Sequence, residues 1–381
     1  MPTPSARITL ATALLAAGTA WNAGNIGPVT ATLAADFSAS LTAVGLLSGT
    51  VFFVGVLATT VVAPAVAGRI GVGTAARLAC VLCGAGNVLF AISPWFGGLL
   101  AARVVIGAGL GLALVLGPVF ARAYGGVRLL GVFGAGVTIG MAAAIGIGSL
   151  LEDAGVDWRV AFGISAVAGV VALPLLPAQM EAGAPPDRHA TGMLRAMARS
   201  LPLWRVAFVY VGSFGIQLVI GAWLIHYLTV EGDISISLAG LLAFVMFGFS
   251  AASREAGGAL SARGVSPVIL VGVAPLLAAV GLVAIALEPT FGVALGAVIL
   301  MGIGFSTPYA VMMDEAQRLF PERPVAPITV LQIGTNVFPM IVIPVVGAAL
   351  AAGNGDAALI ALAVVSCGAG IANFKPAVPT R

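Results

Sequence analysis

Long apolar runs, separated by short charged or turn-rich breaks, extend along the whole chain of 381 residues. A helix needs about 20 apolar residues to cross the hydrocarbon core of a bilayer. Twelve runs have about that length, at approximately 8–31, 41–67, 74–92, 97–121, 129–150, 160–177, 204–228, 238–260, 267–287, 291–313, 325–350 and 356–374. The pattern therefore predicts an all-α integral membrane protein with twelve transmembrane helices. Arg7 and the first run superficially resemble a signal peptide, but the run continues without a clean cleavage site, so we expect a retained spanning helix.

Composition supports a location in the bilayer. Hydrophobic residues make up 60% of the chain and charged residues only 8%, whereas a soluble domain carries about 25% charged residues. The net charge of +3 is too small to indicate a nucleic-acid partner. Three cysteines and two histidines provide no metal-ligand cluster, and no nucleophile constellation is readable. The sequence therefore predicts no enzyme, no metal site and no cofactor.

The charges in the breaks predict how the chain crosses the membrane. Alternate breaks belong to opposite membrane faces; one set, together with both termini, carries fourteen of the 17 Lys and Arg residues, and the other carries eight acids and Arg159. Positive residues remain in the cytoplasm, so both termini and the longest loop are predicted to be cytoplasmic. That loop, 178–203, contains an amphipathic helix pattern and links two six-helix bundles, 1–177 and 204–381. We expect a monomer in a bacterial cytoplasmic (inner) membrane.

Several motifs lie at matching places in this pattern. The break after the second run contains Arg69 and Gly71, and the segment from the end of the eighth run into the following break contains Gly258 and Arg263. The fourth run begins Arg103-Val104-Val105-Ile106-Gly107-Ala108-Gly109-Leu110-Gly111, and the sixth is entered through Asp157-Trp158-Arg159-Val160-Ala161-Phe162. With these motifs the chain resembles the major facilitator superfamily over essentially its whole length. The resemblance implies two six-helix bundles that rock around a central site, with Arg69, Gly71, Gly258 and Arg263 in the loops that control the conformational change.

Polar residues inside the apolar runs are the candidates for binding a solute, because such residues avoid lipid and mark a water-filled pathway or a helix contact. The two cations within spans, Arg103 and Arg254, each cost about 2.5–3.5 kcal/mol at a helix centre. The substrate-binding candidates are Asn22, Asn25, Arg103, Gln217, Arg254, Tyr309, Gln332 and Asn336. For Arg254 two interpretations stay open: a structural cation paired with a carbonyl or with Glu255, or a contact for an anionic substrate. Arg103 and the two asparagines likewise either join helices or line the cavity.

Proton coupling usually needs a carboxylate within the membrane. The candidates are Glu255, which follows Arg254, Asp36 at the outer end of the first run, and His226 near the outer end of the seventh. A solvated interfacial histidine is the alternative for His226.

We therefore predict a secondary transporter that moves a small polar or anionic solute by alternating access, with a coupling proton or a counter-anion as a second partner. The alternative is a proton-coupled efflux antiporter for lipophilic compounds. Against it stand Ala144-Ile145 in the fifth run, where the antiporter motif of the resembling family has Gly-Pro, and the lack of a membrane carboxylate in the first half. A second alternative, a non-transporting membrane sensor, would need a signalling domain, for which we expect no room in tails of about seven residues.

Overall fold

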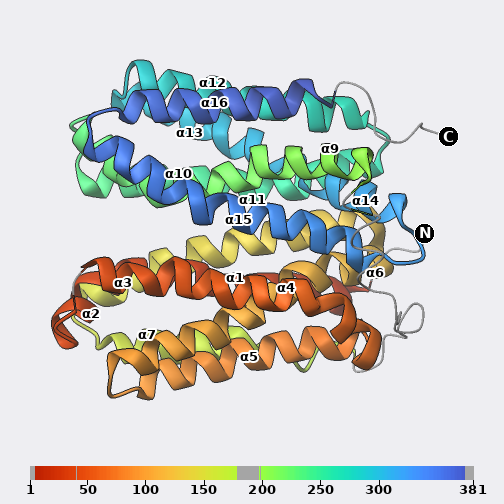
Figure 1. Cartoon of the computed structure of the whole chain (residues 1–381), viewed down its shortest axis with the longest axis horizontal. Coiled ribbons are helices and arrows are strands. Elements are labelled where there is room, and N and C mark those ends of the chain that lie inside the picture. Colours follow the sequence, from red (N-terminus) through yellow and green to blue (C-terminus); the bar gives the residue numbers. More distant parts are fainter. Residues whose placement is uncertain (1–4, 40, 178–196, 198, 374–381) are drawn as a thin grey trace. The chain divides into compact units, whose positions relative to one another are not determined.

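Figure 1 shows the computed structural model of the chain, which describes residues 5–39, 41–177, 197 and 199–373. All regular secondary structure among these residues is helical, in agreement with the predicted all-α class. The chain divides into two compact units: unit 1 comprises residues 1–190 and 322–333, and unit 2 comprises residues 191–321 and 334–381. The predicted linker helix within 178–203 lies largely outside the described residues.

Unit 1 contains the helices of the first six predicted runs. In chain order they are α1 (Ala6–Ala20), η1 (Trp21–Ala23), η2 (Gly27–Val29), α2 (Thr30–Asp36), α3 (Leu41–Ser48), α4 (Thr50–Ile70), α5 (Val72–Ile92), α6 (Phe96–Asp153) and α7 (Trp158–Val170). At the end of the unit that carries the N-terminus, Arg7 and Arg77 donate to the Pro174 and Leu176 carbonyls at 3.4 and 3.0 Å. These bonds satisfy carbonyls just beyond the end of α7.

The first apolar run is a broken helix rather than the single helix that its length predicts. α1 ends at Ala20, and two short 3-10 turns follow before α2 begins at Thr30. Asn22, Gly24 and Asn25 in the gap have low helix propensity. Pro28 lacks a backbone N–H and disfavours helical geometry in the residue before it. The break frees backbone carbonyls within the span, where each needs a donor from the protein.

The fourth and fifth predicted runs meet inside α6. At the junction Gly125 has φ −154° and ψ 16°, and Gly126 has φ 59° and ψ −151°. Only glycine adopts the second conformation without steric strain. The junction lies in the predicted break at 122–128, so α6 consists of two helices joined at this glycine pair.

Glycines of the fourth run let α4 and α6 approach closely. A Cβ added to Gly107 would collide with the Phe52 carbonyl, and one added to Gly111 would collide with the Val56 carbonyl. Small residues allow this approach in membrane helix pairs, which gain stability from packing rather than from the exclusion of water. The same approach brings the Arg103 guanidinium carbon to 4.3 Å from the centre of the Phe52 ring.

Unit 2 contains the helices of the last six predicted runs. In chain order they are α9 (Leu201–Tyr210), η3 (Val211–Gly215), α10 (Ile216–Val230), α11 (Ile236–Ala262), η4 (Ile269–Val273), α12 (Ala274–Leu287), α13 (Phe291–Ser306), α14 (Tyr309–Leu319), α15 (Val325–Ala351) and α16 (Gly355–Ile371). The elements η3 and η4 are π-helical, and Thr307 and Pro308 separate α13 from α14. The first part of α15 belongs to unit 1.

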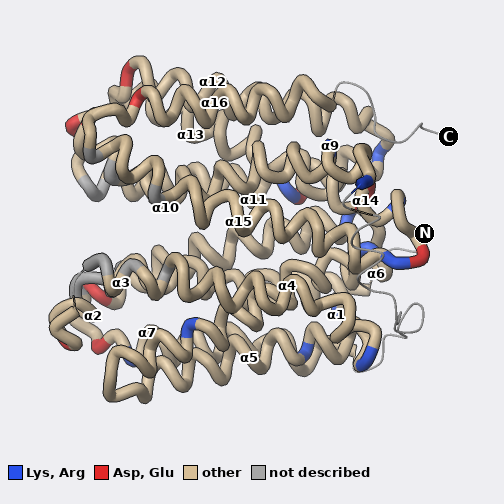
Figure 2. The backbone as a smooth tube through the Cα atoms, in the orientation of Figure 1, with Lys and Arg blue, Asp and Glu red and all other residues tan. Residues whose placement is uncertain are grey.

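The described helices are suited to a membrane. Eight helical segments are long and apolar enough to cross one: Thr50–Ile70, Val72–Ile92, Phe96–Glu152, Leu201–Val230, Leu238–Ala262, Ile269–Leu287, Phe291–Leu319 and Val325–Leu350. Two shorter apolar helices are Trp158–Val170 and Gly355–Ile371. Within each unit taken by itself, most acidic residues lie at one end of the helices and most Lys and Arg residues at the other (Figure 2). The protein is therefore a multi-pass membrane protein.

Candidate functional site

Arg103 is the centre of a buried polar cluster in unit 1. Its side chain is 0% exposed. Its Nε donates to the Leu47 carbonyl at 2.6 Å, one terminal nitrogen donates to Asn25 Oδ1 at 3.2 Å, and the other donates to the Asn22 carbonyl at 3.0 Å. The ring of Phe52 covers the guanidinium. All of these partners are neutral.

The two carbonyls that receive these bonds lie at helix ends. Asn22 belongs to η1, which ends the helix that begins as α1, and Leu47 is in the last turn of α3. The C-terminal end of a helix carries a partial negative charge of about half an electron. Two such ends compensate much of the charge of Arg103. The break after η1 in the first run and the break between α3 and α4 in the second run thus explain how a cation is held here by neutral groups.

Amide and hydroxyl groups complete the unit 1 cluster. Asn87 Nδ2 donates to Asn22 Oδ1 at 2.7 Å and to the Cys83 carbonyl at 2.8 Å. Asn25 Nδ2 and Trp21 Nε1 donate to Ser165 Oγ at 3.2 and 2.8 Å. Together with the bonds of Arg103, these bonds join η1, α3, α5, α6 and α7 into one network whose members bind one another. A closed network of this kind stabilises helix packing.

Arg254 of α11 is the centre of a second buried cluster, in unit 2. Its side chain is 0% exposed, and its guanidinium carbon lies 4.4 Å from the centre of the Phe214 ring and 4.7 Å from that of Tyr309. Its Nε donates to Ser306 Oγ at 3.4 Å and a terminal nitrogen donates to Gln217 Oε1 at 3.3 Å. Aromatic rings stabilise a desolvated cation by about 2 kcal/mol. The two rings therefore offset part of the cost of burying Arg254.

The π-helical element η3 positions part of this cluster. It contains Phe214, and Gln217 follows in the first turn of α10. The ring of Tyr210, just before η3, stacks on Phe214 with centroids 5.6 Å apart and lies 6.1 Å from the Tyr309 ring. π-helical turns are rare and often occur at functional sites.

Gln217 connects the cation to the backbone of α13. Its Nε2 donates to Ser250 Oγ at 2.7 Å, and the Ser250 hydroxyl donates to the Gly302 carbonyl at 3.2 Å. The Ser306 hydroxyl donates to Gln217 Oε1 at 3.4 Å. The bonds from Gln217 to Ser250 and from Ser250 to Gly302 therefore lead away from Arg254. The Ser306 hydroxyl and Arg254 share one acceptor, Gln217 Oε1.

Three buried polar atoms of unit 2 have no hydrogen-bond partner within the described residues. They are Tyr309 OH, Thr335 Oγ1 and Asn336 Nδ2, in side chains that are 2%, 0% and 1% exposed. Leaving a buried donor or acceptor unsatisfied costs about 1–3 kcal/mol, so such atoms in a native fold call for an explanation. A bound solute that supplies the missing partner is one.

The predicted binding residues thus separate into two sets. The structure brings together Asn22, Asn25 and Arg103 in unit 1, and Gln217, Arg254 and Tyr309 in unit 2. Asn336 is buried in the unit 2 part of α15. Gln332 lies in the part of α15 that belongs to unit 1, and its Nε2 donates to the Leu114 carbonyl at 3.0 Å.

The three coupling candidates lie in different settings. Glu255 is exposed and forms no ion pair in the described part of the chain, since neighbouring residues on a helix point about 100° apart and Arg254 is buried. Asp36 is exposed at the end of α2 and accepts a bond from Trp158 Nε1 at 2.7 Å. His226 lies in α10, but its side chain is outside the described part of the structure.

The predicted conformational loops have matching geometry. Arg69 is exposed in the last turn of α4, and Arg263 is exposed at the end of α11. A glycine with positive φ follows each: Gly71 at 79° and Gly264 at 87°. Gly258 is buried within α11.

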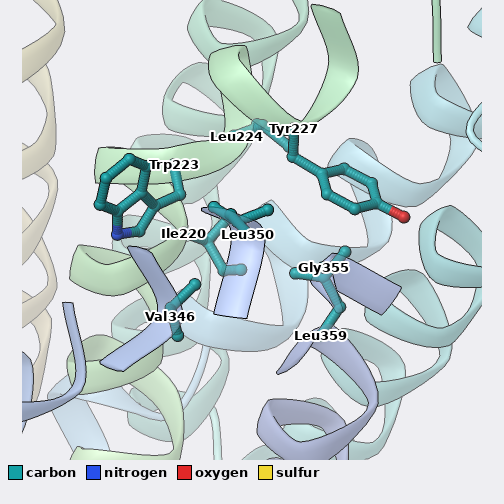
Figure 3. Close-up of a pocket in the computed structure, with 8 residues that line it drawn as sticks. All are labelled: Ile220, Trp223, Leu224, Tyr227, Val346, Leu350, Gly355 and Leu359. Carbon is teal, nitrogen blue, oxygen red and sulfur yellow. The ribbon is translucent and has the colours of Figure 1, made fainter. Parts of the chain in front are cut away.

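The pocket in Figure 3 is a separate feature of unit 2. It is lined by Ile220, Trp223, Leu224, Tyr227, Val346, Leu350, Gly355 and Leu359, from α10, α15 and α16. The polar atoms of its two aromatic residues are bonded elsewhere: Trp223 Nε1 to the Ile343 carbonyl at 2.9 Å, and Tyr227 OH to Asp356 at 2.5 Å. The lining is therefore apolar, and the pocket is unsuited to a polar solute.

Sequence reasoning missed several residues of the two clusters. Phe52, Phe214, Asn87, Ser165, Ser250 and Ser306 all contact the clusters. The two phenylalanines have no signal in a hydrophobic run, because their role depends on which cation they cover. The serines and Asn87 are polar residues inside spans and could have been selected by that signal.

Comparisons with known proteins agree with this architecture. The structure of the proton:xylose symporter XylE bound to 6-bromo-6-deoxy-D-glucose matches with a TM-score of 0.79 at 14% identity, over 97% of this chain and 94% of that one. A structure of the E. coli fucose:proton symporter FucP matches with a TM-score of 0.75 at 18% identity, over 96% and 97%. The outward conformation of FucP gives 0.76 at 18% identity, over 97% and 98%. These likenesses establish the fold. No curated protein matches the sequence.

The sequence also matches a family as a whole. The model of the Major Facilitator Superfamily covers residues 11–327, well over half of the chain. The predicted resemblance is thereby confirmed, as is the prediction that the protein is not an enzyme. The chain belongs to the major facilitator superfamily, and it is a membrane transporter of the secondary class.

Proposed function

We propose that this transporter moves a small polar or anionic solute across a bacterial cytoplasmic membrane by alternating access. The observation that carries the proposal is the Arg254 cluster, in which a buried cation lies over the ring of Tyr309 and the buried Tyr309 hydroxyl has no hydrogen-bond partner within the described residues. A buried cation and an unsatisfied hydroxyl within an apolar helical unit both cost free energy, and a bound solute would recover part of that cost. Arg103, by contrast, has the role of a structural cation, because its donors bind helix-end carbonyls and an asparagine.

The proposal includes a topology of twelve spans with both termini in the cytoplasm. Each of the twelve predicted runs contains helix, and within each unit most acids lie at one helix end and most cations at the other (Figure 2). The two functional halves would be residues 1–177 and 204–381, with 178–203 as a cytoplasmic linker. We expect the working protein to be a monomer.

The named structural neighbours are symporters of sugars with protons. They support a small hydrophilic solute and a coupling proton for this chain as well. Glu255, Asp36 and His226 are the proposed coupling groups, and Glu255 is the first to test because it adjoins the Arg254 cluster in sequence.

Uptake into proteoliposomes tests the function directly. Purified protein should give saturable, solute-dependent flux for a hydrophilic solute identified first by thermal-shift screening. Arg254→Ala should abolish the flux, while protein-free liposomes give none. If the reconstituted protein moves no hydrophilic solute but moves lipophilic cations against a proton gradient, the efflux alternative replaces this proposal.

A further inference from the structure

Two arginines at one end of unit 1 bond to the same short segment. Arg7, in the first turn of α1, donates from a terminal nitrogen to the Pro174 carbonyl at 3.4 Å, and Arg77 of α5 donates to the Leu176 carbonyl at 3.0 Å. Both carbonyls follow α7, which packs against α1 and against α5. Two residues of chain span at most about 7 Å, so the segment brings the two guanidinium groups to one place.

These two cations have no acidic partner in the described part of the chain. Each makes one hydrogen bond within the described residues and neither forms an ion pair there, although a guanidinium has five N–H donors. The C-terminal end of α7 offsets about half of one charge. The acids of the described residues 5–177 lie at the opposite helix ends: α2 ends at Asp36, α6 ends at Glu152 and Asp153, and Asp157 caps the start of α7. Most of the positive charge of the two arginines is therefore uncompensated.

The two arginines also lie one helical turn beyond apolar side chains that face outward. Leu10 follows Arg7 by three positions and is 50% exposed, and Val81 follows Arg77 by four positions and is 46% exposed. Residues three or four apart share a helix face. Exposed apolar side chains of a multi-pass membrane protein contact hydrocarbon, and the arginines lie about 5 Å farther along the helix axes. That is the level of the polar headgroup layer, which borders the hydrocarbon core.

We propose that Arg7 and Arg77 bind the phosphate of an anionic phospholipid in the leaflet at this end of unit 1, with its acyl chains against the exposed apolar face that includes Leu10 and Val81. Arginine binds phosphate through charge-assisted hydrogen bonds, and basic pockets between transmembrane helices bind anionic headgroups. A soluble phosphate would use the two guanidinium groups but not the apolar face. The bound headgroup joins α1 and α5 to the segment that follows α7, and it thereby stabilises unit 1.

Two phospholipids with identical chains test this site. The detergent-solubilised protein, freed of its native lipid, is titrated with dioleoylphosphatidylglycerol and in parallel with dioleoylphosphatidylcholine, whose headgroup has no net charge. Phosphatidylglycerol should raise the melting temperature saturably and by several degrees more than phosphatidylcholine does, because a ligand that binds the folded state stabilises it. Equal shifts would overturn the proposal. Glycerol phosphate is the third probe: if it stabilises the protein as strongly as phosphatidylglycerol at the same concentration, the ligand is a soluble phosphate and the lipid assignment is wrong.

Glutamine variants locate the binding groups. Arg7→Gln and Arg77→Gln each remove one charge but keep an N–H donor for the carbonyl. Each should weaken the apparent affinity for phosphatidylglycerol about fivefold, a difference of about 1 kcal/mol, which is what one basic residue contributes near an anionic membrane surface. The double variant should weaken it about 25-fold. The single variants retain one of the two arginines, so they remain informative where the double variant melts too low to be titrated.

Arg128→Gln is the matched control for charge. Arg128 is an exposed arginine of unit 1 beside the glycine junction inside α6, and within the described residues it makes no bond to Pro174 or Leu176. The control should bind phosphatidylglycerol like the wild type. If it loses as much affinity as Arg7→Gln or Arg77→Gln, the lipid is attracted by general positive charge and the assigned site is wrong. Full affinity in Arg7→Gln and Arg77→Gln would reject the site as well.

Discussion

At the scale of single residues, the two buried arginines differ in their hydrogen-bond partners. Arg103 binds the Leu47 and Asn22 carbonyls and Asn25 Oδ1. The change Arg103→Met keeps an apolar chain of similar length and leaves these three acceptors without their donor. Each unsatisfied buried acceptor costs about 1–3 kcal/mol, so we expect the apparent melting temperature in detergent to fall by several degrees.

Solute affinity separates this task from a binding role. In Arg103→Met, measured below its melting transition, affinity should stay within about threefold of the wild type, a difference of about 0.7 kcal/mol. Arg103→Lys should recover part of the lost stability, because lysine can donate but cannot span the three acceptors as a planar fork. A variant that melts like the wild type and no longer binds solute would show instead that Arg103 contacts the solute.

Sequence alone identifies the two arginines but not their partners. A charge inside an apolar run is conspicuous at any position, so Arg103 and Arg254 were both selected. The partners of Arg103 are mostly backbone carbonyls, which every residue has, and they become available only where a helix breaks. The fully buried Asn22 was likewise selected, but its bond to Asn87, 65 positions away, depends on helix packing that no local pattern specifies.

A further residue-scale prediction concerns proton coupling. Glu255→Gln removes the ionisable group and keeps the size of the side chain. If Glu255 takes up the coupling proton, the variant should still exchange solute across proteoliposome membranes but lose the pH dependence of net uptake. Glu231→Gln is the control, since Glu231 is also exposed but lies at the C-terminal cap of α10, away from the Arg254 cluster in sequence. Unchanged pH dependence in Glu255→Gln would transfer the coupling role to Asp36 or His226.

At the scale of elements, helix packing depends on a few glycines rather than on all of them. A Cβ on Gly107 would collide with the Phe52 carbonyl, whereas one on Gly146, in the same element α6, would meet nothing within 4 Å. We expect Gly107→Ala to lower stability by about 1–3 kcal/mol through overpacking. Gly146→Ala should be neutral or stabilising by up to about 1 kcal/mol, because alanine favours the helix. Equal melting temperatures for the two variants would contradict this view of the α4–α6 contact.

The positions of the helices could be predicted from hydropathy, but the interruptions within them could not. Apolar runs predicted where helix occurs, because a chain in lipid must satisfy its backbone groups internally. Hydropathy does not report interruptions, so the gap at 21–29 in the first run and the π-helical η3 in the seventh were not predicted. The pairs Gly24-Asn25 and Gly27-Pro28 carry a turn signal that the count of apolar residues overrode.

At the scale of the whole molecule, the family assignment follows from agreement between independent signals. The loop motif at Arg69 and at Arg263 occurs in both halves, each half has six apolar runs, and the family match over residues 11–327 agrees with these signals. The solute class does not follow from these signals, because they concern the fold that the family shares. It depends on a few side chains whose hydrogen-bond directions only a structure can provide.

The orientation in the membrane is the last prediction, and single cysteines can test it. In a background where Cys80, Cys83 and Cys367 are replaced by alanine, Ala154→Cys and Asn354→Cys place exposed thiols at the acidic ends of units 1 and 2. Ala123→Cys and Ala262→Cys place exposed thiols at the opposite, arginine-rich ends.

A membrane-impermeant maleimide added to intact cells should label the first pair and leave the second pair unlabelled until the membrane is permeabilised. The physical reason is that arginine-rich loops are retained in the cytoplasm during insertion. The reverse labelling pattern would mean that the whole molecule has the opposite orientation in the membrane. Labelling of Ala154→Cys with Ala262→Cys, or of Ala123→Cys with Asn354→Cys, would mean that the two units insert with opposite orientations. An even number of spans in the first half does not permit that arrangement. Either result would therefore reject the twelve-span topology with cytoplasmic termini.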